Sequence, residues 1–405
     1  MRSLSLIAVS SLFFTSVFAQ EQTEEGLAKI LDVDEECKPY SYPDVQNHLS
    51  EFPKSWDEAH ILPTDSEGQA KWNSIKDSVP NLTPKASFQG GADGDFYQYM
   101  STYPQSDPDC WWSFKQCIGD GDVAKVPEPL TIGFGFDDGP NCSHNAFYDF
   151  LQQNNQKATM FYIGSNVLNW PLQAKRGVTD GHEICVHTWS HRHMTTLSSE
   201  DAFAELWYIV PVADLSTLLA MKAIELVTGV TPDCWRPPEG DVDNRIRAIA
   251  KGLGLDTILW EYDSEDWRVN AGKATPEQVD SNYQNFINDA KNGKFDKEGA
   301  IILQHEINNY TMTEAMKWYP QMKEAFKSIV PVGVALDGDK PSGNGSTSAG
   351  SSGSASRSAT QSSASHTASA SADRNTSSGN GASTHSTTPS VLLALAALSF
   401  GALIL

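Results

Sequence analysis

Residues 130–140 read LTIGFGFDDGP, and this stretch decides the fold that we expect. The run from Leu130 to Phe136 is almost wholly apolar, which predicts a buried strand. Two adjacent carboxylates, Asp137 and Asp138, follow it, and Gly139-Pro140 then forces a turn. Adjacent carboxylates repel each other, so we expect a metal ion or another cation beside one of them. An ordinary acidic turn has the same composition, so the pair alone decides little.

From Pro129 onward the sequence alternates between strand and helix patterns. Repeated β-α units imply a parallel sheet, either open or closed into a barrel, and each candidate motif falls at the carboxyl end of a strand, where such folds build their sites. The expected strands are Leu130–Phe136, Lys157–Ile163, Glu183–Val186, Thr257–Tyr262 and Ala300–Leu303, and the expected helices are Asn145–Gln153, Ala202–Leu226 (interrupted near Pro211) and Asn244–Gly252.

Two histidines follow the strand Glu183–Val186 in the motif HTWSH, residues 187–191. His187 and His191 are four residues apart, so a helical turn or a tight loop can aim both at one point. Histidine pairs are also common on surfaces, but the preceding strand and the upstream Asp pair favour ligation. One carboxylate and two imidazoles form the ligand set of an open divalent-metal site, most naturally Zn²⁺. The second carboxylate is then free to act as a base.

Three further motifs follow at later strand ends. In the motif RPPEG (236–240) the prolines fix a rigid turn that would hold Arg236 against a carboxylate. The motif DSEDW (263–267) leaves a strand with acids and an aromatic residue, and LQH (303–305) ends an apolar strand. Each motif alone suits a solvated loop, but five in this order on successive strand ends indicate a hydrolytic metal site.

With these five motifs in this order, the chain resembles the polysaccharide deacetylase family (NodB homology domain), in particular fungal chitin deacetylases, over about residues 129–331. The resemblance implies an α/β fold, a distorted (β/α) barrel with one metal ion, here with an irregular N-terminal extension. It implies metal-dependent hydrolysis of the N-acetyl groups of chitin to chitosan and acetate. The metal is expected to be Zn²⁺, although Co²⁺ or Mn²⁺ suits the same ligands.

The resemblance also implies roles for the first motifs. Asp138, His187 and His191 would bind the metal. Asp137 would be the general base, and Arg236 would orient it. A backbone N–H of the Arg236 loop and the metal would hold the oxyanion.

The later motifs would complete the site. His305 would be the general acid, which needs a proton to give to the leaving amine. Asp266, or Asp263 beside it, would set the orientation and pKa of His305 or pair with Arg236. Trp267 and Leu303 would wall the groove for the acetyl group.

Glu239 departs from the family, which usually has Tyr after Arg-X-Pro. A carboxylate at the mouth of the site would favour a substrate with a nearby free amine, that is, partly deacetylated chitin. This expectation fails if Glu239→Tyr leaves the ratio of activity on chitin to activity on partly deacetylated chitosan unchanged.

The first residues, 1–19, predict a secretory signal. Arg2 gives a positive start, the run from Leu6 to Phe14 is mostly apolar, and Val17-Phe18-Ala19 suits cleavage. A first buried helix is the alternative, but polar, acidic sequence follows at once.

The last residues predict a glycosylphosphatidylinositol attachment signal. Val391–Leu405 is apolar but shorter than the roughly 20 residues of a spanning helix. The polar spacer Ser383–Ser390 and the small residues Gly379–Ala382 precede it, so the attachment residue would be Asn380 or Gly381. A tail-anchored protein is the alternative, which the secretory signal disfavours.

Between these ends we expect the following division. A stretch dominated by Ser, Thr, Ala and Gly cannot offset its ordering entropy and predicts a disordered, O-glycosylated stalk. The segments are 1–19 signal peptide, 20–127 N-terminal extension, 128–340 catalytic domain, 341–381 stalk and 382–405 attachment propeptide. The protein would then be secreted and anchored to the outer face of the plasma membrane, the cell wall, or both.

Glycosylation sequons and cysteines fit an oxidising, extracellular setting. The sequons are Asn81, Asn141, Asn309, Asn344 and Asn375. Six cysteines favour disulfides: Cys37, Cys110, Cys117, Cys142, Cys185 and Cys234. Cys110 and Cys117 are close enough for a local loop, whereas Cys185 and Cys234 could either face each other or stay buried thiols. No Cys-X-X-Cys pair exists, which disfavours a cysteine-ligated zinc site.

The net charge of −22 disfavours nucleic acid, which needs a basic surface. An acidic surface suits a neutral or cationic polymer and equally serves solubility alone. The expected partners are chitin or chitosan and, through the lipid anchor, the membrane, with no obligate protein partner. Two rivals remain: the same chemistry on another N-acetylated glycan or on partly deacetylated chitosan, and a non-catalytic chitin-binding wall protein. The full set of ligands, base and acid argues against the last.

Overall fold

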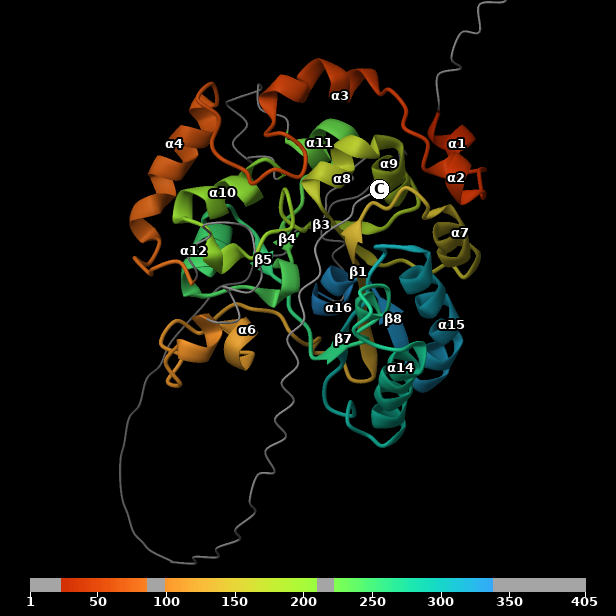
Figure 1. Cartoon of the computed structure of the whole chain (residues 1–405). Coiled ribbons are helices and arrows are strands. Elements are labelled where there is room, and N and C mark those ends of the chain that lie inside the picture. Colours follow the sequence, from red (N-terminus) through yellow and green to blue (C-terminus); the bar gives the residue numbers. More distant parts are fainter. Residues whose placement is uncertain (1–22, 86–98, 210–221, 338–405) are drawn as a thin grey trace, which may run out of the picture. The chain divides into compact units, whose positions relative to one another are not determined.

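A parallel sheet forms the centre of the protein in a computed structural model that describes residues 23–85, 99–209 and 222–337 (Figure 1). The long first strand, β1, pairs with three other strands. On one side its start pairs with β8 and its later part pairs with β2. The strand β7 pairs with its other side. The strands are β1 Thr131–Gly139, β2 Thr159–Tyr162, β3 Glu183–Val186, β4 Cys234–Trp235, β5 Asp256–Thr257, β6 Tyr262–Asp263, β7 Ala300–Leu303 and β8 Ser328–Val330.

The sheet is curled into a distorted barrel, as the family resemblance implied. Its order is β5-β4-β3-β2-β1-β7-β6, with β8 beside β1. The two edge strands, β5 and β6, are consecutive in the chain. The segment from Thr257 to Tyr262 spans at most about 18 Å even when fully extended, so the two edges must approach each other. The strands carry the candidate motifs at one end of this barrel.

Helices with clear sequence signals pack around the sheet. Asp243 caps α12 by accepting hydrogen bonds from the N–H groups of Arg245 and Ile246. Thr275 and Gln278 form a capping box at the start of α14. The helices of this region are α7 Asn145–Gln153, α8 Gly164–Asn169, α9 Pro171–Thr179, α10 Ser199–Trp207, α11 Ala223–Thr228, α12 Asn244–Gly252, α13 Trp267–Asn270, α14 Pro276–Lys291, α15 Asn309–Ala325 and α16 Val332–Asp337.

Several expected elements are confirmed with their bounds, namely α7, α12, β3 and β7. One expectation is wrong: Thr257–Tyr262 is not a single strand, because only its two ends pair, each with a different neighbour. Another needs correction, since β1 continues through Asp137 and Asp138 to Gly139. Of the expected helix Ala202–Leu226, α10 and α11 are present, and residues 210–221 lie outside the described residues.

The N-terminal extension is more regular than we expected. It contains the short helices α1 Glu24–Leu27, α2 Val33–Glu36, α3 Pro43–His48, α4 Ser66–Ile75 and α6 Trp112–Lys115. Thr23, Asp32 and Asp65 each accept a backbone hydrogen bond that starts one of them. α1 contacts α9, α3 contacts α11 and α4 contacts α10, so these helices of the extension form an arc around the barrel helices (Figure 1).

All six cysteines form disulfides, which confirms that expectation. The pairs are Cys37–Cys142, Cys110–Cys117 and Cys185–Cys234. The first links the extension to the loop after β1, and the last joins β3 to β4. The structure therefore resolves the alternative between paired cysteines and buried thiols in favour of pairing.

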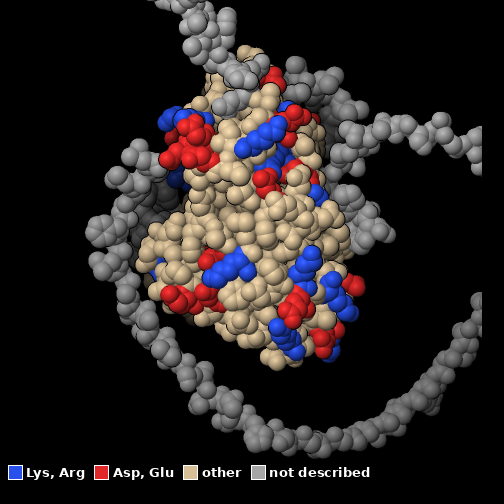
Figure 2. All heavy atoms as spheres, turned by 90° about the vertical axis from the view of Figure 1, so that its right-hand side faces the viewer, with Lys and Arg blue, Asp and Glu red and all other residues tan. Residues whose placement is uncertain are grey.

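The charge is not gathered into one acidic surface on the face that carries α7, α14 and α15. Acidic and basic side chains lie there in small mixed groups, with a wide uncharged area between them (Figure 2). No helix within residues 23–85, 99–209 and 222–337 is both long and apolar enough to cross a membrane. The predicted signal peptide 1–19, the stalk 341–381 and the propeptide 382–405, including Asn380 and Gly381, lie outside the described residues.

Candidate active site

Asp138, His187 and His191 come together at the carboxyl ends of β1 and β3. One ligand atom from each lies within 4.8 Å of the others. The Oδ1 atom of Asp138 is 3.4 Å from Nε2 of His187 and 3.2 Å from Nε2 of His191. The loop after β3 places the two imidazoles by a tight turn, with positive φ at Thr188 and His191. The predicted ligand set is therefore assembled in space.

The donor atoms fit a divalent metal ion. His187 donates its Nδ1–H to the carbonyl of Arg236 at 2.8 Å, which fixes the tautomer and leaves Nε2 with its lone pair. Oδ1 of Asp138 is buried and has no hydrogen-bond partner among the described residues. Burial raises the pKa of Asp138, but the neighbouring imidazoles lower it by more than burial raises it. The pKa of Asp138 therefore falls well below its usual value. An ionised oxygen facing two imidazole nitrogens is a donor set for a divalent ion.

Asp137 and Arg236 form a buried ion pair beside these ligands. Nη1 of Arg236 donates to Oδ1 of Asp137 at 2.7 Å, and both residues are almost fully buried. The guanidinium carbon of Arg236 lies 4.0 Å from the centre of the Phe161 ring, and this cation–π contact helps to orient the guanidinium group. The other oxygen of Asp137 lies 3.7 Å from Nε2 of His187, on the side of the metal ligands. The structure thus pairs Arg236 with Asp137, one of the two partners considered for it.

His305 is paired with Asp266. Its Nδ1 lies 2.6 Å from Oδ1 of Asp266, and its backbone N–H donates to the other oxygen at 3.1 Å. Burial lowers the pKa of His305, but the Asp266 carboxylate more than offsets this, so the pKa rises to about 10. A backbone bridge between Asp137 and His305 brings the two residues to neighbouring positions. A protonated imidazole at neutral pH is what a general acid requires.

The remaining predicted residues surround this centre. Leu303 ends β7, opposite Asp263 of β6, and Trp267 begins α13 directly after Asp266. Asp263 accepts a hydrogen bond from the N–H of Glu265 instead of pairing with His305. Glu239 has a positive φ of 53°, and its carboxylate lies 2.7 Å from Nε2 of His193. The carboxylate on which the free-amine hypothesis rests is thus already paired with an imidazole.

Three buried acids beside the motif loops were not predicted from the sequence. The first is Glu205 of α10, which is fully buried and accepts hydrogen bonds from the N–H and hydroxyl of Ser190 and from the N–H of Ala59. It therefore ties the loop that carries His191 to the extension. No sequence signal marked it, because a Glu inside a helix is common.

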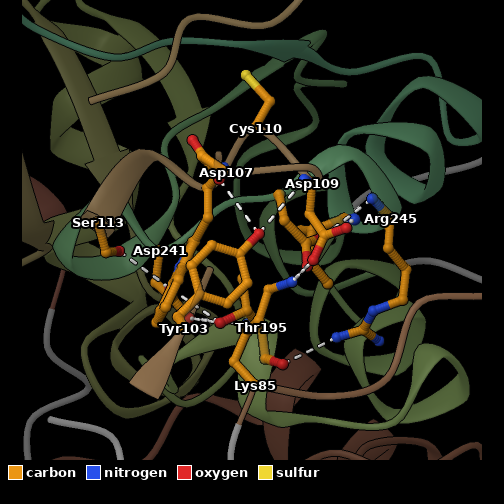
Figure 3. Close-up of polar contacts among 12 residues, drawn as sticks. Lys85, Tyr103, Asp107, Asp109, Cys110, Ser113, Thr195, Asp241 and Arg245 are labelled. Carbon is orange, nitrogen blue, oxygen red and sulfur yellow. Dashed lines mark hydrogen bonds and ion pairs between the residues drawn. The ribbon is translucent and has the colours of Figure 1, made fainter. Parts of the chain in front are cut away.

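The second missed acid is Asp241, directly after the RPPEG motif. It accepts hydrogen bonds from the N–H and hydroxyl of Thr195, from Ser113 and from the indole of Trp111 (Figure 3). It thereby joins the loop after His191 to the loop after Arg236. Its position beside a motif is a signal that could have found it.

A buried polar cluster lies around Asp241 (Figure 3). Lys85 is 1 % exposed and pairs with Asp109, and it lies 3.3 Å from Asp243. Arg245 donates to the carbonyl of Thr195 at 3.0 Å. Removing one partner from such a buried network leaves an uncompensated charge, so the cluster fixes this part of the extension against the barrel.

The third missed acid is Glu306, next to His305. It is fully buried, and its carboxylate occupies the space where a side chain on Gly139 would lie. Burial raises the pKa of Glu306 to about 8. The glycine of the FDDGP motif is thus required by the close approach of this acid, in addition to the turn.

The sequons differ in their surroundings. Asn81 and Asn309 are exposed, whereas Asn141 donates its amide to the carbonyl of Ile307 at 2.7 Å and accepts from Ser143. Asn344 and Asn375 lie outside the described residues.

Glu183, Cys185 and Cys234 also lie close enough for a metal site, but both sulfur atoms belong to one disulfide and are not available as ligands.

Comparison with known proteins agrees with this arrangement. The family model described as "Polysaccharide deacetylase" matches residues 124–258. "Chitin deacetylase 2" of Cryptococcus neoformans var. grubii is 46 % identical over 333 residues, which are 80 % of this chain and 70 % of that protein. "Chitin deacetylase" of Amylomyces rouxii is 40 % identical over 324 residues, 77 % of this chain and 72 % of that protein. The solved chitin deacetylase of Colletotrichum lindemuthianum is 24 % identical, with a TM-score of 0.45, over 53 % of this chain and 91 % of that one.

Proposed function

Because this chain belongs to the polysaccharide deacetylase family and is an enzyme of that family, we propose that it hydrolyses the N-acetyl groups of chitin to give chitosan and acetate. The observation that carries the proposal is the meeting of three groups at one end of the barrel. They are the ligand set Asp138, His187 and His191, the Asp137–Arg236 pair and the His305–Asp266 pair. Relatives named chitin deacetylases, similar over most of the chain, support chitin as the substrate.

Asp138, His187 and His191 would hold one divalent ion, and we propose Zn²⁺. When bound, such an ion polarises the acetamide carbonyl and lowers the pKa of a water at the site. Nitrogen and oxygen ligands of this kind also suit Co²⁺ and Mn²⁺, and the proposal of Zn²⁺ rests on the set of one carboxylate and two imidazoles.

The protein's own groups then divide the proton transfers. Asp137 takes a proton from the attacking water, while the hydrogen bond from Arg236 keeps the carboxylate oriented. A backbone N–H of the loop after Arg236 supports the oxygen of the former carbonyl. His305 gives a proton to the leaving amine, and Asp266 keeps that imidazole protonated and oriented. Trp267 and Leu303 wall the space for the acetyl group.

We further propose that the enzyme acts at the cell surface. The secretory signal expected at 1–19 and the attachment propeptide expected at 382–405 support this location, and the three disulfides fit an oxidising compartment. The stalk would give the catalytic domain reach into newly made wall polymer.

Acetate release from chitin oligomers, with and without a chelator, tests the proposed activity. We expect release that a chelator stops and added metal restores. Release from no oligomer at any metal loading would instead favour a chitin-binding protein without catalysis. Release from another N-acetylated glycan only would correct the substrate.

The variant Asp137→Asn tests the proposed base. It should abolish turnover while metal content stays near normal, because Asp137 is not among the ligands. A variant that keeps turnover would show that another group accepts the proton. Measurement of bound metal separates this outcome from loss of the site.

A further inference from the structure

A cavity of about 410 Å³ opens beside the metal ligands and is lined partly by the N-terminal extension. Asp138 and His191 form one side of it. Trp56, which belongs to the extension, and Trp170, between α8 and α9, line it as well. The volume is in the range of small-ligand sites. The cavity is thus continuous with the reacting centre, and a residue outside the 124–258 family match contributes to it.

The lining of the cavity suits a neutral sugar. Apart from the metal ligands Asp138 and His191, none of the lining residues carries a charge. Two indole rings supply apolar faces, and asparagine side chains supply polar groups. A pyranose ring has the same combination, since its C–H face packs on an aromatic ring while its hydroxyl edge forms hydrogen bonds.

Trp56 is held in place by its backbone. Its N–H donates to the hydroxyl of Ser165 at 2.8 Å, and its carbonyl accepts from Arg192 at 2.8 Å. Arg192 adjoins the ligand His191, and Ser165 also donates to the carbonyl of Trp189 in the same motif. Trp56 has a φ of 69°, a region that bulky residues rarely adopt. Strained positions of this kind concentrate at ligand-binding sites.

The ring of Trp56 stays open to solvent although its backbone is fixed. The residue is 43 % exposed. Folding alone gains little from a tryptophan held in a strained conformation with its side chain half exposed, whereas a ligand that covers the ring gains apolar contact.

The extension also orients the second indole. The ring of Tyr40 lies 6.4 Å from that of Trp170, and its hydroxyl accepts from the N–H of Leu172 at 2.8 Å, at the start of α9. The disulfide Cys37–Cys142 anchors this part of the extension to Cys142, which itself lines the cavity. Residues 37–56 therefore contribute Trp56 to the cavity and also contact Trp170.

We propose that Trp56 is a sugar-stacking residue of an additional subsite, which binds an N-acetylglucosamine unit of the chitin chain next to the unit being deacetylated. The inference rests on the proposed function and adds to it that the N-terminal extension recognises the polymer.

The test compares Trp56→Gly with a control in the same extension. Glycine accepts positive φ without strain, so the variant removes the ring while the backbone hydrogen bonds can persist. Leu49→Ala is the control, because Leu49 is 44 % exposed, belongs to the extension and does not line the cavity. For chitin hexamer we expect Trp56→Gly to raise KM roughly five- to tenfold with kcat and metal content unchanged. Trp56→Phe, which keeps a smaller ring, should raise it less, and Leu49→Ala should match the unchanged protein.

The possible results distinguish a failure of the proposed subsite from a failure of the proposed function. If the unchanged protein releases no acetate, the proposed function fails. If it does, but Trp56→Gly has the KM of Leu49→Ala, the subsite is wrong. A loss in kcat together with lower metal content would also overturn it, because Trp56 would then support the ligand loop instead of the sugar. Titration of metal-loaded Asp137→Asn with hexamer provides an independent measure, since adding Trp56→Gly to it should weaken binding by the same factor.

Discussion

Replacing Asp266 with Asn should convert the enzyme into one that works only at low pH. In the structure the carboxylate of Asp266 pairs with Nδ1 of His305 and accepts the N–H groups of His305 and Trp267. Asparagine has nearly the same shape and keeps one acceptor oxygen, so the fold around the site should persist. What the variant loses is the negative charge that keeps His305 protonated.

The size of the effect follows from the pKa of His305. Burial lowers this pKa from its usual 6.5, and three carboxylates raise it to about 10, that of Asp266 most and those of Asp138 and Asp137 less. Without the Asp266 charge we expect a pKa of about 6.5. The protonated fraction at pH 8 would then fall from nearly all to about 3 %, a loss of about 30-fold, whereas at pH 5.5 about 90 % would remain protonated.

The assay is kcat/KM for acetate release from chitin hexamer between pH 5.5 and 8.5, expressed as the ratio of variant to unchanged protein. The ratio should be near one at pH 5.5 and fall about tenfold per pH unit above about pH 6.5. Glu265→Gln is the matched control, because it removes a charge from the adjacent residue, which pairs with Arg268. Its ratio should not depend on pH. A flat ratio for Asp266→Asn would refute the role of His305 as an acid maintained by Asp266.

Two further predictions concern buried acids. Glu205→Gln should lower the free energy of unfolding by about 1–3 kcal/mol and weaken metal retention after dialysis. The reason is that at least one of the N–H groups of Ala59 and Ser190 loses its acceptor. If the variant retained as much metal as the unchanged protein, Glu205 would not hold the ligand loop. Burial raises the pKa of Glu306 in the folded state to about 8, so between about pH 4.5 and 8 the folded state keeps a proton that the unfolded state has lost. The free energy of unfolding should therefore fall as the pH rises through this range, by at most about 1.4 kcal/mol per pH unit. Glu306→Gln should lack this component in urea titrations at pH 5 and 8, and equal slopes for both proteins would refute the assignment.

The sequence predicted most of the barrel because its elements carry local signals. Apolar runs such as Ala300–Leu303 need no context to be identified as buried strands. It failed at Thr257–Tyr262, since whether an extended segment pairs along its whole length depends on neighbours that the sequence does not place. The helices α14 and α15 were not predicted, although α14 begins with Thr275-Pro276 and a capping box that could have identified it.

For the candidate site, the motif residues could be predicted but their supports could not. Asp137, His187 and Arg236 fall at strand ends, so parallel topology brings them together. Glu205 and Trp56 are different, because each acts through contacts with a segment more than 100 residues away in sequence. The extension looked irregular because its short helices bury few residues each, and because some of its aromatic residues pack on the motif loops, as Phe52 does on Trp189.

The disulfide between β3 and β4 sets the register of the active site. β4 has only two residues, and one pair, Val186 with Trp235, defines its alignment to β3. A ladder this short specifies its register weakly, and a slip of one residue would turn every side chain to the opposite face. The covalent link between Cys185 and Cys234, the residues just before that pair, forbids the slip. One bond outside the candidate site thus keeps the imidazole of His187 and the guanidinium of Arg236 directed into the same space.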